Sequence, residues 1–151
     1  MSEKNMNLAL EVAMKSIVLL KNESELLPLN KNNQTIALIG PLASDKNSSL
    51  GNWRSQAIYN SATSVLEAMT NYSGNKLFYE KGVDLYYNTT DFHNRVNLNL
   101  DDRSDFSKAK TVAEKADVVV MVLGEEGYQS GEGRSRTCLL YTSDAADEVA
   151  G

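Results

Sequence analysis

The stretch Asp117–Thr137, DVVVMVLGEEGYQSGEGRSRT, opens as a strand and continues into a polar loop. Its beginning, up to Leu123, is a nearly unbroken apolar run, which is typical of a strand buried on both faces of a parallel sheet. We therefore expect this strand to be the most buried one in the molecule. The loop that follows carries three glutamates and four glycines, an unusual amount of negative charge at the end of such a strand.

Toward the N-terminus, the sequence holds two further candidate strands. TIALIG, residues 35–40, is a short apolar run closed by a Gly-Pro pair, and KLFYEKG, residues 76–82, is the second. Helical patterns lie between the candidate strands, over residues 62–72 and residues 104–116, and Ser104 is the expected N-cap of the latter.

A further helix is predicted near the N-terminus, with Ser2 as its N-cap. Its apolar residues recur at spacings of three and four, which gives it one apolar stripe: Met6, Leu10, Ala13, Met14 and Ile17. After this helix, the β-branched and leucine run of residues 17–20 predicts a short extended segment.

The alternation of strand and helix over residues 35–123 predicts an α/β fold, with a mainly parallel sheet and flanking helices. In such sheets, ligands bind at the carboxyl ends of the strands. Two prominent loops are expected to leave this edge, one after Ile39 and one after Leu123. The acidic loop therefore lies where α/β proteins usually place their chemistry.

Composition narrows the possible partners. The chain has 151 residues, a formal net charge of −5 and no basic run, which argues against nucleic acid or an anionic membrane as a partner. A single cysteine and a single histidine give no zinc ligand cluster, and we predict no metal or other cofactor. The N-terminal residues lack the regions of a secretory signal, so the sequence leaves the localisation open.

The acidic loop could have one of four functions, and its residues suit some of them better than others. A phosphate cradle is disfavoured because the glycine spacing is wrong and Glu125, Glu126 and Glu132 would repel an anion. A calcium or magnesium site is disfavoured because the carboxylates do not have the spacing of an EF-hand. A plain surface loop and a loop that projects a carboxyl for acid/base chemistry both remain open, and composition alone favours the surface loop.

Four motifs, in this order and spacing, resemble the start of the C-terminal α/β-sandwich domain of glycoside hydrolase family 3, the β-glucosidase family. They are ALEVAMKSIVLLKNESELLPLN, IALIGPLA, LGNW and the segment ADVVVMVLGEEGYQSGEGRSRT. The resemblance covers about residues 5–137. It implies an incomplete α/β sandwich over residues 1–137.

The family consists of retaining exo-acting β-glycosidases, which remove terminal β-linked glycosyl residues from oligosaccharides or glycosides. The nucleophile is an aspartate of a preceding (β/α)8 barrel domain, and the general acid/base is a glutamate on a loop of the sandwich domain. The resemblance assigns that role to Glu132 in SGEGRSR, with Glu125 in LGEE as the alternative. A tryptophan in GNW, Trp53, would pack at an interface, which we favour, or stack on a sugar.

The sequence also departs from the family pattern. The barrel domain, and with it the nucleophile, has no counterpart here, so we expect the chain alone to hydrolyse no aryl β-glucoside. Residues 138–151, CLLYTSDAADEVAG, resemble a translated sequencing adapter, and we interpret them as an artefactual tail. The competing interpretation of the whole chain is a non-catalytic, flavodoxin-like α/β binding or interaction module.

Overall fold

The computed structural model describes residues 2–72, 74–88 and 96–130. The chain divides into two units, Met1–Asn30 and Lys31–Gly151. Glu132 and the tail predicted over residues 138–151 lie outside the described residues.

The N-terminal unit contains one helix, α1, Glu3–Ser16. Its N-cap is Ser2, as expected: the Ser2 hydroxyl accepts a hydrogen bond from the Asn5 amide at 3.4 Å. Ile17 then takes an extended backbone conformation (φ −71°, ψ 129°) and ends the helix. Within residues 2–30 no side chain is buried, and the apolar stripe of α1 is exposed.

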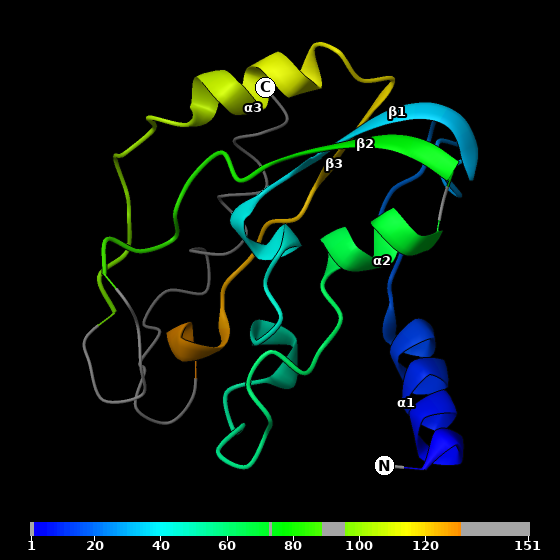
Figure 1. Ribbon diagram of the computed structural model, residues 1–151, viewed down its shortest axis with the longest axis vertical. Helices are drawn as coiled ribbons and strands as arrows, with labels where there is room; N and C mark the ends of the chain where they lie inside the picture. The colour runs from blue at the N-terminus through cyan, green and yellow to red at the C-terminus, as the bar shows by residue number, and fades with distance from the viewer. Residues whose placement is uncertain (1, 73, 89–95, 131–151) are drawn as a thin grey trace. The chain divides into compact units, whose positions relative to one another are not determined.

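The second unit is built on a three-stranded sheet (Figure 1). The strands are β1 (Asn32–Ile39), β2 (Gly74–Glu80) and β3 (Val118–Met121). Their order is β2-β1-β3, and both pairs are parallel. The predicted α/β fold with a parallel sheet is therefore confirmed.

The register of β3 is set at its first residue. Val118 lies opposite Ile36 of β1. Immediately before it, the Asp117 amide donates to the Thr35 carbonyl oxygen at 2.8 Å, and the Thr35 amide donates to Asp117 Oδ2 at 2.7 Å. Because a slip of one residue would turn every side chain of the strand to the other face, this two-way contact also decides which residues face the core.

Two short helices lie on opposite sides of the sheet (Figure 1): α2 (Val65–Tyr72) and α3 (Phe106–Ala113). Ala109 of α3 packs on Ala37 and Ile39 of β1. The alternate residues of β1, Ile36 and Leu38, point to the other face and are also fully buried. The core therefore lies on both faces of β1.

The expectation that residues 117–123 form the most buried strand is wrong. Val118 is buried, but Val119 is 43% exposed and Met121 is 52% exposed. Within the described residues, β3 pairs only with β1 and lies at the edge of the sheet. The central strand, β1, has neighbours on both sides and is the most buried.

Two predicted helix starts also need correction. α2 begins at Val65, three residues later than expected, because Ser64 and Glu67 form a reciprocal cap. The Ser64 hydroxyl accepts from the Glu67 amide at 3.1 Å, and the Glu67 carboxylate accepts from the Ser64 amide at 3.0 Å. The N-cap of α3 is Asp105 in place of Ser104. In the described part of the chain, no helix is long and apolar enough to cross a membrane.

Candidate functional site

Two loops leave the carboxyl ends of the neighbouring strands β1 and β3. The β1 loop, residues 40–64, contains two single-turn 3₁₀ helices, η1 (Pro41–Ala43) and η2 (Ser48–Leu50). The β3 loop, residues 122–130, contains a third, η3 (Gly127–Gln129). Because β1 and β3 are parallel, both loops start at the same edge of the sheet, as the sequence predicts.

The two loops begin in direct contact at Gly40. Its φ of 130° lies in the region that disfavours side chains, and a Cβ atom there would lie 2.2 Å from the Val122 carbonyl oxygen. On the preceding residue, the Ile39 carbonyl oxygen accepts from the Val122 amide at 2.8 Å. Only glycine allows the backbones to approach this closely.

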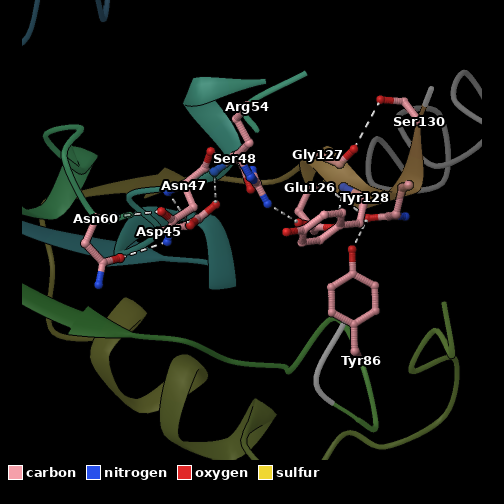
Figure 2. Close-up of polar contacts among 11 residues, drawn as sticks. Asp45, Asn47, Ser48, Arg54, Asn60, Tyr86, Glu126, Gly127, Tyr128 and Ser130 are labelled. Carbon is pink, nitrogen blue, oxygen red and sulfur yellow. Dashed lines mark hydrogen bonds and ion pairs between the residues drawn. The ribbon is translucent and has the colours of Figure 1, made fainter. Parts of the chain in front are cut away.

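Side-chain hydrogen bonds organise the β1 loop (Figure 2). The Asp45 carboxylate accepts from the amides of Asn47 and Ser48, at 2.8 and 2.9 Å. The Asn47 side chain bonds the side chain and the amide of Asn60, each at 2.8 Å. Burial raises the pKa of Asp45, but hydrogen bonds from Ser48 and Asn47 lower it. The charge of Arg54 lowers it further, and the pKa lies below its ordinary value.

Arg54 connects the β1 loop to the β3 loop (Figure 2). Its Nη1 donates to the Asn47 carbonyl oxygen at 2.7 Å, and its Nη2 lies 3.8 Å from Glu126 Oε2. Its guanidinium also stacks on Tyr128, with Cζ 4.4 Å from the ring centroid. The side chains of Arg54 and Glu126 are only 12% and 11% exposed, so this ion pair is largely shielded from water.

The β3 loop is folded around Glu126 and Gln129. Glu126 is the N-cap of η3: its carboxylate accepts from the Tyr128 amide at 2.6 Å, and its own amide donates to Gln129 Oε1 at 2.9 Å. Gln129 is buried, and the same Oε1 accepts from the Tyr86 hydroxyl at 3.0 Å (Figure 2). These hydrogen bonds therefore fix the conformation of residues 126–129.

Of the two predicted catalytic residues, the structure describes one. Glu125, the alternative candidate, is exposed directly before the η3 cap. Glu132, the preferred candidate, lies outside the described residues. Sequence reasoning missed the structural roles of Glu126 and Arg54. The spacing Glu-x-x-Gln over residues 126–129 could have indicated a capping box, whereas nothing in the sequence pairs Arg54 with this loop.

Two hollows flank the joined loops. One, of about 480 Å³, lies between the β1 loop and the segment after β2, and is lined by polar side chains that include Asp45, Lys81 and Asp84. The other, of about 410 Å³, is lined by Trp53, Tyr59 and Tyr128 together with amide side chains. Trp53 is 74% exposed, so its expected packing at an interface stays a prediction. No group of three or more His, Cys, Asp or Glu suited to a metal occurs among the described residues.

Comparison with known proteins identifies relatives of the chain. It is 38% identical over 150 residues to a periplasmic β-glucosidase from Salmonella typhimurium, covering 93% of this chain and 20% of the relative. It is 30% identical over 148 residues to a β-xylosidase from Formosa agariphila, covering 93% of this chain and 19% of the relative. The chain thus spans about a fifth of the length of these relatives.

Solved structures show the same fold. A β-glucosidase from Listeria innocua, in complex with gluconolactone, matches with a TM-score of 0.69 and 26% identity, over 90% of this chain and 16% of that one. A family 3 exo-β-xylosidase, in complex with a xylobiose aziridine probe, matches with a TM-score of 0.65 and 29% identity, over 88% of this chain and 15% of that one.

The family comparison agrees with these relatives. The model of the glycosyl hydrolase family 3 C-terminal domain matches residues 17–150, which is most of the chain. The family resemblance of the sequence motifs is therefore confirmed, and the chain belongs to glycosyl hydrolase family 3, as part of its C-terminal domain.

Proposed function

We propose that this chain is part of a retaining, exo-acting β-glycosidase of the β-glucosidase type, which hydrolyses terminal β-linked glycosyl residues. The observation that carries the proposal is the family match over residues 17–150, which includes the whole acidic loop. The β-glucosidases and β-xylosidases among the relatives support the same class of reaction. This match to a hydrolase domain supports the enzyme over the flavodoxin-like binding module.

In the proposed mechanism, Glu132 is the general acid/base. It donates a proton to the leaving glycosidic oxygen while a carboxylate nucleophile attacks the anomeric carbon and forms a glycosyl ester. The ionised Glu132 then takes a proton from water, and the oxygen of that water displaces the nucleophile. Two inversions at the anomeric carbon leave the β configuration of the released sugar unchanged.

The nucleophile belongs to an N-terminal barrel domain of the same protein. A retaining mechanism needs two carboxyl groups about 5 Å apart, which two domains can supply because only the final geometry matters. The relatives are about five times longer than this chain, which leaves room for such a domain. The chain alone is therefore proposed to be inactive.

The geometry of the β3 loop argues against Glu126 as the general acid/base. Both carboxylate oxygens of Glu126 are already engaged, one with the Tyr128 amide and the other beside Arg54, so Glu126 is a poor proton donor. In the sequence, Glu132 comes three residues after the buried Gln129. Glu125 is exposed and remains the alternative.

The proposal is tested with Glu132→Ala and Glu125→Ala in the longer protein that carries this chain. Loss of the general acid should reduce kcat/KM for a poor leaving group, such as methyl β-glucoside, by roughly 100-fold to 10,000-fold. A dinitrophenyl glucoside needs little protonation and should lose far less in that step. Azide needs no general base, so it should restore turnover of the activated substrate and give β-glucosyl azide.

Glu114→Ala serves as the matched control, because Glu114 is an exposed glutamate at the end of α3. It should leave all rates unchanged. If Glu125→Ala shows the leaving-group dependence and azide rescue while Glu132→Ala does not, the two assignments are exchanged. If the longer protein releases no sugar from any β-glycoside, the proposed activity is wrong.

A further inference from the structure

The largely buried ion pair between Arg54 and Glu126 is an unusual way to join two loops. Removing two charges from water is costly, and an apolar pair of similar volume is often equally stabilising. Here the two side chains are 12% and 11% exposed, and their closest charged atoms are 3.8 Å apart. Net stability is therefore a weak explanation for the pair, whereas fixing one loop conformation is a better one.

The contacts of Arg54 are suited to holding a position. Its guanidinium donates to the Asn47 carbonyl oxygen in the β1 loop and contacts Glu126 and Tyr128 in the β3 loop. A planar guanidinium can make these contacts at once, along its edge and on its face, so they constrain its orientation as well as its distance.

The β1 side of this contact is itself fixed. Asn47, whose carbonyl oxygen accepts from Arg54, is held through its amide by Asp45 and through its side chain by Asn60. Arg54 therefore connects the β3 loop to a part of the molecule that already has several hydrogen bonds.

On the β3 side, the guanidinium lies directly against the backbone of Gly127. A Cβ atom on Gly127 would lie 2.9 Å from Arg54 Nη1 and 3.4 Å from the Gly51 carbonyl oxygen. The residues next to Gly127 are the two partners of Arg54, Glu126 and Tyr128. Arg54 therefore contacts three consecutive residues at the start of η3.

We infer that Arg54 is a positioning residue for the general acid/base. It fixes the β3 loop through Glu126 and Tyr128, and so fixes the point from which the chain continues to residue 132. The inference rests on the proposed function, because it assumes that Glu132 transfers the proton. Arg54 itself contacts neither the substrate nor the proton in this role.

The experiment measures kcat/KM of the longer protein for β-glucosides of increasing leaving-group quality, with Arg54→Met, Arg54→Lys and Gly127→Ala. A misplaced acid should lower the rate for the poorest leaving group by roughly 10-fold to 100-fold, and for a dinitrophenyl glucoside by much less. Gly127→Ala should show the same dependence, because it displaces the guanidinium without removing its charge. Arg54→Lys keeps the charge opposite Glu126 and should recover part of the loss.

Arg103→Met is the matched control, because Arg103 also stacks on an aromatic ring, that of Phe106, but at the start of α3. It should leave the leaving-group dependence unchanged. A variant that merely lowers the folded fraction reduces the rate for every substrate by the same factor, and that result for Arg54→Met would overturn the inference. If Glu132→Ala shows the dependence and Arg54→Met does not, only the positioning role fails. If Glu132→Ala does not show it, the assignment of Glu132 as the general acid/base fails first, and the positioning role fails with it.

Discussion

The central strand β1 ends in an apolar run, Ile36–Ile39, and the edge strand β3 consists of one, Val118–Met121, but the two runs have different environments. In β1, Ile36 and Leu38 are 1% and 0% exposed, whereas Val119 and Met121 of β3 are 43% and 52% exposed. β1 pairs with a strand on each side, while β3, within the described residues, pairs with β1 alone. An apolar run thus indicates that a segment belongs to a sheet, but not which place it takes there.

The largest effect on stability is expected where the ends of these two strands meet, at Gly40. Gly40→Ala adds a Cβ atom 2.2 Å from the Val122 carbonyl oxygen at a φ of 130°. Backbone strain and overpacking together should lower the free energy of unfolding by roughly 2–6 kcal/mol. Urea unfolding of the 151-residue chain measures this.

Gly51→Ala is the control for this prediction. Gly51 also has a positive φ, 79°, but nothing lies within 4 Å of an added Cβ atom. Only the backbone conformation (φ 79°, ψ 178°), which is open almost only to glycine, is then penalised, by about 1–3 kcal/mol. Equal losses for the two variants would show that the ends of β1 and β3 do not approach as closely as described.

The next effect compares a leucine of the central strand with one just beyond the edge strand. Leu38 is 0% exposed and Leu123 is 57% exposed. Leu38→Ala should lower the free energy of unfolding by about 2–5 kcal/mol, because it leaves a cavity. Leu123→Ala should change it by about 0.5 kcal/mol or less. Similar losses in urea unfolding of the two variants would contradict the assignment of β1 as the centre of the core.

The smallest effect on stability is expected on the exposed face of β3. Met121→Lys replaces a half-exposed apolar side chain with a charged one and should change the free energy of unfolding by about 1 kcal/mol or less. Exposed apolar edge strands promote association, so the variant should self-associate less in sedimentation velocity experiments. Ser107→Lys, on an exposed position of α3, adds the same charge and should leave self-association unchanged.

Much of the fold could be predicted from the sequence, because it depends on local patterns. The three strands, the helices between them and the Ser2 cap of α1 all follow from apolar periodicity and capping residues. The later start of α2 could also have been predicted from the sequence, since Ser64 and Glu67 have the spacing of a capping box. The edge position of β3 could not be predicted from the sequence, because strand order depends on pairing between segments that are distant in the chain.

The candidate site could likewise be predicted from the sequence only in part. Its place at the carboxyl ends of the strands follows from the fold class alone. The contact between Arg54 and Glu126 does not, because neither residue stands in a motif that points to the other, and the two come from different loops. The catalytic role of Glu132 stays a prediction.

The strand order also has a consequence for biosynthesis. β1 is made first among the three strands, but both of its neighbours come later in the chain, and β3 ends only at Met121. During translation the most buried strand therefore leaves the ribosome before its second neighbour has been made. This interval, in which one side of β1 lacks its partner, is when the nascent chain is most exposed to aggregation and to capture by chaperones.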